Sequence, residues 1–299
     1  MPSRKAKPAA EPVFGAYDQK ALDAQYNLRA QVPTHQAFFD RWLADSAAAA
    51  EQLAPVRDIR YGAGDKQLLD LFVPEGDGPY PVFLFIHGGY WQALSKDYTL
   101  FPAPGFVANG IAYASIGYDL CPDVSLDALV EEVRGAVEWV HHHARDHRLD
   151  RKRLYVGGHS AGGHLTAMML STDWARRGLP FDIVKGGCSV SGLYELEPLR
   201  LSYQNEVLRL TPEAVARLSP RNVMPAQSGP LILTVGGNET DEFQRQQADF
   251  ASDWRLRGLP LVVVDSPDVN HFEILDAFKD PESGLMRAIR GMVGISAPA

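Results

Sequence analysis

Residues 154–170 read LYVGGHSAGGHLTAMML and contain the pattern G-x-S-x-G at 158–162. A short apolar run precedes the pattern, and a helical pattern begins near Ala161. This order of strand, tight turn and helix is the setting in which a serine lies on a strained turn, with its hydroxyl exposed above a sheet. Glycines flank the serine because strand and helix pass too closely for a Cβ. The segment therefore predicts Ser160 as a nucleophile at the end of a buried strand.

Short apolar runs and amphipathic segments alternate on both sides of this turn. Strands that alternate with helices predict a mostly parallel, twisted α/β sheet that is covered on both faces. The expected strands are 68–73, 81–86, 111–116, 154–157, 184–190, 231–235 and 261–264, and the expected helices are 126–140, 162–176, 241–257 and 281–292.

The domain organisation follows from where this alternation holds and where it stops. No linker interrupts it, so we expect a single domain at 16–299 after a disordered tail at 1–15. Residues 18–53 have the apolar spacing of helices with a face to bury. Residues 193–224 carry few strand signals and three prolines, which predicts a small helical cap inserted over the sheet.

A nucleophilic serine needs a base, because a free hydroxyl is weakly nucleophilic at neutral pH. His271 follows the last expected strand, where a loop brings it to the same sheet edge as Ser160. The base in turn needs a carboxylate that fixes its tautomer. Glu239 follows the strand at 231–235 and is the expected acid, with Asp241 as the alternative. The chain order Ser160, Glu239, His271 is the order expected for such a sheet.

The tetrahedral intermediate of acyl transfer needs preorganised hydrogen-bond donors for its oxyanion. The segment HGGYW at 87–91 follows a buried strand, and its glycines allow backbone N–H groups to face the serine at close range. We expect the amides of Gly89, Tyr90 and Ala161 to form this oxyanion hole. Trp91 and Tyr194 are expected to supply flat apolar walls for a small aromatic substrate.

Composition excludes several classes of protein. The 299 residues hold 29 Lys and Arg against 37 Asp and Glu, a net charge of −8, with 45% hydrophobic residues. An acidic chain without a basic stripe is a poor nucleic-acid binder, and no apolar stretch approaches the roughly 20 residues of a membrane span. Two cysteines and no secretory signal favour the cytoplasm. We expect no cofactor and no metal site, and the N-terminal helix and the cap are candidate surfaces for a homodimer.

Taken together, these motifs resemble the kynurenine formamidase (arylformamidase) group, in the hormone-sensitive-lipase-like branch of the α/β-hydrolases. The resemblance spans roughly residues 18–293. The matching segments are HGGYW at 87–91, YDLCP at 118–122, GHSAG at 158–162, SGLY at 191–194, GGNE at 236–239, EFQRQ at 242–246 and QYN at 25–27. It implies an α/β-hydrolase fold of about eight strands, and it implies Gly89 and Tyr90 as oxyanion-hole residues. Animal members carry Asp at the acid position, where this chain has Glu239, so Asp241 stays an alternative.

The expected function is that of a serine hydrolase that acts on a small molecule through an acyl-enzyme. The resemblance implies aryl formamides such as N-formyl-kynurenine, hence tryptophan breakdown, and small aryl esters. One alternative is a general carboxylesterase of the same branch. A more remote alternative is a ligand-binding protein that keeps the fold without chemistry, although nucleophile, base and acid are all present in the sequence.

Overall fold

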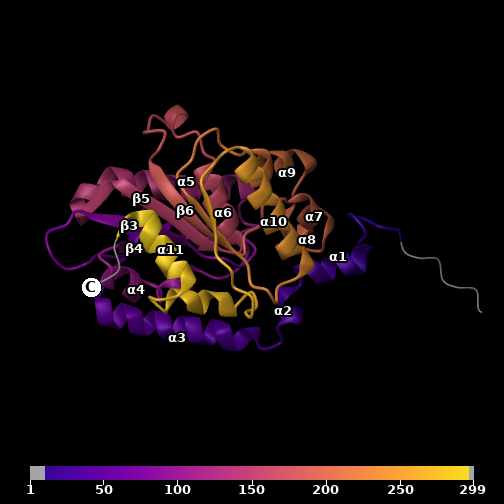
Figure 1. Cartoon of the computed structure of the whole chain (residues 1–299), viewed down its shortest axis with the longest axis horizontal. Coiled ribbons are helices and arrows are strands. Elements are labelled where there is room, and N and C mark those ends of the chain that lie inside the picture. The colour runs from indigo at the N-terminus through magenta and orange to yellow at the C-terminus, as the bar shows by residue number, and fades with distance from the viewer. Residues whose placement is uncertain (1–10, 296–299) are drawn as a thin grey trace, which may run out of the picture.

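Eight strands form one sheet in the computed structural model, which describes residues 11–295 (Figure 1). Their order across the sheet is β1-β2-β4-β3-β5-β6-β7-β8. Strand β2 pairs antiparallel with β1 and β4, and all other neighbouring strands pair in parallel. The strands are β1 (Val56–Arg60), β2 (Leu68–Phe72), β3 (Tyr80–Ile86), β4 (Ala112–Ile116), β5 (Leu149–His159), β6 (Val184–Val190), β7 (Leu231–Thr234) and β8 (Leu261–Val263).

The mostly parallel sheet predicted from the sequence is confirmed, with seven of its strands at the expected places. Strand β1 is the one that the sequence did not predict. It is an edge strand with a largely exposed burial pattern, and its sequence VRDIR has no apolar run. An edge strand that faces solvent carries little hydrophobic signal, so periodicity alone does not find it.

The register of the central strands brings their carboxyl ends to one edge. Ile86 of β3 pairs with Gly158 of β5, and Val190 of β6 pairs with His159 and with Thr234 of β7. The loops that leave β3, β5, β6 and β7 therefore start side by side. In an open α/β sheet this edge is where ligands bind.

Helices cover both faces of the sheet. Helix α5 (Leu126–His143) begins where the Ser125 side chain accepts a hydrogen bond from the Ala128 amide, and it buries the predicted apolar stripe. Helix α6 (Ala161–Leu170) is buried along its whole length. It ends earlier than the predicted 176, and a separate 3-10 turn, η3 (Ala175–Arg177), follows. The sheet is also covered by α3 (His35–Leu53), α4 (Ala103–Ala108), α10 (Asp241–Leu256) and α11 (Gly284–Val293).

The cap and the N-terminal helices meet at one end of the molecule. Figure 1 shows α1 (Gln19–Tyr26) beside α7 (Glu197–Leu201) and α8 (Asn205–Leu208), with α2 (Leu28–Gln31) between α1 and α3. The Gln19 side chain donates to the Leu201 carbonyl at 2.9 Å, and Asp23 accepts from the Tyr203 amide at 2.8 Å. The remaining cap helix is α9 (Pro212–Leu218). The N-terminal segment is thus attached to the cap.

Residues 1–10 of the predicted tail lie outside the described residues. Residues 11–15 are described and make specific contacts. The amide of Val13 donates to the Tyr17 carbonyl at 2.8 Å, and the Arg245 guanidinium lies 5.4 Å from the centre of the Phe14 ring. This end of the predicted tail is therefore held against α10 and is not free. Among residues 11–295, no helix has both the length and the apolar character required to cross a bilayer.

Candidate active site

Ser160 lies on the strained turn between β5 and α6. Its backbone φ is +58° and ψ is −117°, a conformation that a non-glycine residue adopts only when the surroundings enforce it. The Ser160 amide is held by the Val190 carbonyl of β6 at 2.8 Å. A Cβ on Gly162 would lie 1.9 Å from the Ile86 carbonyl oxygen, and one on Gly158 would lie 2.4 Å from the Gly162 carbonyl oxygen. The backbone segments around the serine turn therefore pass so closely that both motif positions, 158 and 162, require glycine.

His271 lies in the loop between β8 and the 3-10 helix η5 (Glu273–Phe278), and its side chain is 5% exposed. Its Nδ1 is 2.6 Å from Oε2 of Glu239. The loop is also held at its backbone, because Nε2 of His159 donates to the His271 carbonyl at 2.8 Å. Burial, and then the nearby His271, lower the pKa of His159, so that ring stays neutral as a donor. These contacts fix the position of the His271 ring.

Glu239 follows β7 and is completely buried, as the acid that orients a catalytic histidine usually is. Its Oε1 accepts from the Gly236 amide at 2.7 Å and from Oγ of Ser191 at 2.5 Å. With Oε1 occupied in this way, Oε2 is left for the histidine. The alternative acid, Asp241, is exposed in the first turn of α10. The structure therefore brings Glu239, and not Asp241, against His271.

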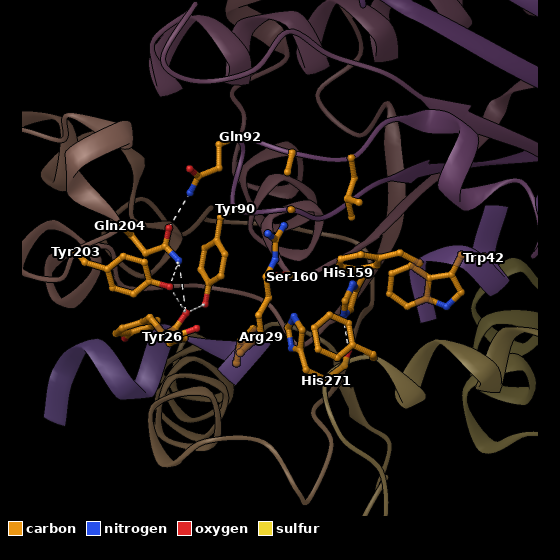
Figure 2. A pocket seen from close by; sticks show the side chains of 17 residues that line it. Tyr26, Arg29, Trp42, Tyr90, Gln92, His159, Ser160, Tyr203, Gln204 and His271 are labelled. Atoms are coloured by element: carbon orange, nitrogen blue, oxygen red, sulfur yellow. Dashed lines mark hydrogen bonds between the residues drawn. The ribbon is translucent and has the colours of Figure 1, made fainter. Parts of the chain in front are cut away.

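Ser160 and His271 line one pocket with a volume of about 460 Å³ (Figure 2). The pocket opens at the carboxyl edge of the sheet, between the cap and the N-terminal helices. Its aromatic wall consists of Tyr26, Phe39, Trp42, Tyr90, Tyr203 and Phe272. A pocket of this size holds a small aromatic molecule.

The loop after β3 passes directly against the serine. A Cβ on Gly88 would lie 3.1 Å from the Cβ of Ser160. The loop then turns sharply, with φ of +104° at Gly89 and +49° at Tyr90. Among residues 11–295, the amides of Gly89, Tyr90 and Ala161 have no hydrogen-bond acceptor. Successive unpartnered N–H groups beside a nucleophile suit an oxyanion.

His87 stabilises the loop after β3 through contacts with Tyr118 and Gly88. Its ring stacks on Tyr118 with 4.1 Å between ring centres, and its Nδ1 lies 2.8 Å from the Gly88 carbonyl. The Tyr118 hydroxyl donates to the His87 carbonyl at 2.7 Å. Burial lowers the pKa of His87 to about 4, so the ring is neutral near neutral pH. His87 thus holds the loop in place.

The N-terminal helices supply a pocket wall that the sequence did not reveal. The Tyr26 carbonyl accepts hydrogen bonds from the hydroxyls of Tyr90 at 3.0 Å and Tyr203 at 3.3 Å, and from Nε2 of Gln204 at 3.4 Å. One carbonyl thereby joins α1, the loop after β3 and the cap (Figure 2). The apolar spacing at 18–53 signals a face to bury, but only the fold shows what that face contacts.

Two known vertebrate enzymes are similar to this chain in sequence. The chain is 34% identical over 249 residues to a kynurenine formamidase of Salmo salar, across 80% of this chain and 82% of that protein. The chain belongs to the kynurenine formamidase family of α/β-hydrolases. A kynurenine formamidase of Danio rerio is 33% identical over 251 residues, with the same coverage of both chains. The family model described as BD-FAE matches residues 69–182.

A solved structure has the same fold as this chain. A candidate thioesterase from Silicibacter sp. TM1040 superimposes with a TM-score of 0.79 and 30% identity, over 90% of this chain and 98% of that one. The sequence resemblance and the predicted fold class are thereby confirmed, and the chain is a hydrolase enzyme.

Two predicted substrate contacts of this formamidase-family chain were wrong. Trp91 is fully buried, edge-on to His164, and does not line the pocket. Tyr194 is also fully buried, stacked on Phe250 with 4.2 Å between ring centres, and its hydroxyl is 2.7 Å from Oγ of Ser189. A sequence shows that such residues are large and flat, but not which side of a loop they face. Both rings belong to the core that supports the site.

Over the described range 11–295, no three His, Cys, Asp or Glu side chains come together as metal ligands. His143, which has metal-ligand spacing to His147, stacks instead on Trp139 at 4.3 Å.

Proposed function

We propose that this chain hydrolyses small aryl formamides of the N-formyl-kynurenine type through a formyl-enzyme on Ser160. The observation that carries the proposal is the 2.6 Å contact between His271 and Glu239 beside the Ser160 turn, within one aromatic pocket. The names of the curated relatives support the choice of substrate. The 460 Å³ pocket is in the usual range for a small ligand.

The first half of the reaction forms the formyl-enzyme. The Nδ1–H of His271 donates to Glu239, which leaves Nε2 of His271 as the base. His271 accepts the Ser160 proton while Oγ bonds to the formyl carbon. The oxyanion that develops is held by the amides of Gly89, Tyr90 and Ala161, and one such donor contributes roughly 2.7–4 kcal/mol. His271 then gives the proton to the departing aryl amine, and the carbon–nitrogen bond breaks.

The second half releases formate. Water enters after the amine leaves, and His271 takes one of its protons as the oxygen attacks the ester carbon. The tetrahedral intermediate uses the same backbone donors. Its collapse breaks the bond to Ser160 Oγ, which recovers its proton from His271. His271 carries the proton in each of these steps, and each turnover converts formamide and water into amine and formic acid, which ionises to formate and a proton.

The competing proposal is a general carboxylesterase, because an ester carbonyl would use the same groups. Comparing kcat/KM for N-formyl-kynurenine with kcat/KM for p-nitrophenyl acetate decides between the two. We expect the formamide to be preferred and the Ser160→Ala variant to be inactive on both. A large preference for the ester would remove the formamidase assignment, whereas activity that persists in Ser160→Ala would remove the mechanism. Binding without any turnover would support the non-catalytic alternative.

We also propose a reducing, cytoplasmic setting for the protein. Cys121 and Cys188 are both buried as free thiols, and burial raises the pKa of each. Buried thiols of this kind behave as small apolar side chains. Thiol titration of the denatured protein after purification without reductant should find two free groups, and a disulfide would contradict the proposal.

A further inference from the structure

The pocket contains one permanently charged side chain. Among the described residues that line it, Arg29 is the one Lys or Arg, and no Asp or Glu lines it. The chain as a whole has a net charge of −8, and the Glu239 carboxylate beside the pocket is engaged by Nδ1 of His271. His159, which also lines the pocket, is kept neutral by burial. Among the residues that line the pocket, a ligand carboxylate therefore finds one cationic partner, whereas a ligand ammonium finds no carboxylate.

Arg29 lies on α2, a single turn that is fixed at both ends. The Asn27 side chain accepts from the Ala30 amide at 3.2 Å, and the Val32 amide donates to the Leu28 carbonyl at 3.0 Å. The Arg29 guanidinium lies 5.8 Å from the centre of the Phe39 ring. In Figure 2 its side chain extends from α2 into the pocket, between Tyr90 and His271. The Arg29 charge is thus presented to the same pocket that Ser160 and His271 line.

The Arg29 guanidinium has no carboxylate partner within residues 11–295. Arg41, on α3, is paired by contrast, because it binds both oxygens of Asp276, at 2.9 and 2.7 Å. The nearby Asp23 is engaged instead by the Tyr203 amide at 2.8 Å. Arg29 is an exposed residue, and its planar guanidinium fork, which matches the two oxygens of a carboxylate, is available to a ligand.

We propose that Arg29 binds a carboxylate of the substrate and makes this enzyme selective for aryl formamides that carry a carboxylate. The inference rests on the proposed function, since it places the formyl group at Ser160 and the carboxylate at the other end of the same molecule. Arg29 acts on binding and orientation, and it takes no part in proton transfer.

The test compares two formamides in wild type and in Arg29→Gln. One is N-formyl-kynurenine, a zwitterion that carries a carboxylate and an ammonium group, and the other is 2-formamidoacetophenone, which has the same aryl formamide and neither charged group. A charge-assisted hydrogen bond contributes enough for a loss of about ten- to a hundredfold. We expect kcat/KM to fall by that factor for the formamide that carries the carboxylate, mainly through KM, and to stay within twofold for the uncharged one. Arg29→Lys should recover part of the loss.

Arg41→Gln is the matched control, because it removes one positive charge from the same N-terminal segment outside the pocket. It should leave the ratio of the two kcat/KM values unchanged. An equal loss on both substrates in Arg29→Gln, or no loss on either, would overturn the proposal. Failure of the proposed function looks different: the wild-type enzyme would then hydrolyse neither formamide.

Discussion

Replacing Glu239 by Gln removes one charge from the site and leaves its shape almost unchanged. The Gln oxygen can take the place of Oε1 and accept from the Gly236 amide and the Ser191 hydroxyl. The amide nitrogen then faces Nδ1 of His271 across 2.6 Å and can only donate there. His271 must therefore carry its proton on Nε2. In that tautomer the ring cannot accept the proton of Ser160.

The expected loss follows from this change of tautomer. The same substitution, acid to amide, in the serine protease triad lowers kcat by about 10⁴-fold, and we expect a loss of that order for Glu239→Gln. Glu239→Asp is a different perturbation, because it shortens the side chain by about 1.5 Å and extends the 2.6 Å contact beyond hydrogen-bond reach. Its kcat should lie between those of wild type and Glu239→Gln.

Steady-state kinetics on an aryl formamide measure both variants, with thermal unfolding to show that they are folded. Asp241→Asn is the matched control, because Asp241 is exposed on α10 and makes no contact with His271. It should retain wild-type kcat within about threefold, as expected of a surface substitution. If Glu239→Gln kept more than a tenth of wild-type kcat, or if Asp241→Asn lost as much, the assignment of the acid would be wrong.

Three further predictions concern stability. Burial lowers the pKa of His164 from 6.5 to about 4. As pH falls between these two values, the unfolded chain binds a proton at His164 and the folded chain does not. The free energy of unfolding therefore drops by up to about 3 kcal/mol over this pH range. In urea unfolding at pH 7.5 and 4.5, His164→Gln should show a smaller drop than wild type, and an equal drop would contradict the buried neutral ring. Gly162→Ala should lower the free energy of unfolding by about 3 kcal/mol, because the added Cβ meets the Ile86 carbonyl. Gly135→Ala, in open space on α5, should raise it by about 0.4–1 kcal/mol. Equal effects of the two substitutions would contradict the steric explanation. Trp91→Phe should lower the free energy of unfolding by about 2 kcal/mol with KM within twofold, and a large rise in KM would return Trp91 to the substrate site.

Much of the fold could be predicted because its signals are local. A buried parallel strand is a continuous apolar run, as in β3, and the serine turn needs glycines at fixed offsets from Ser160. His271 and Glu239 could be named in advance because each follows a strand whose carboxyl end must lie at the shared edge. Topology of this kind converts positions far apart in the chain into neighbours.

Contacts that depend on tertiary packing could not be predicted. Tyr26 and Arg29 lie more than a hundred residues before Ser160, and nothing in their local pattern says which surface they cover. Trp91 follows the oxyanion loop directly, yet a backbone φ of +57° accompanies its burial in the core. The choice between Glu239 and Asp241 likewise depended on which carboxylate is buried, and the sequence of a loop does not predict which of its side chains are buried.

Fluorophosphonate labelling followed by peptide mass spectrometry measures most directly whether Ser160 is an activated nucleophile. The adduct should be found on Ser160 alone, and labelling should be lost in Ser160→Ala and slowed strongly in His271→Ala, because the base that removes the hydroxyl proton is then missing. An unlabelled native protein, or a label that persists in Ser160→Ala, would contradict the assignment of Ser160, His271 and Glu239 as the catalytic groups.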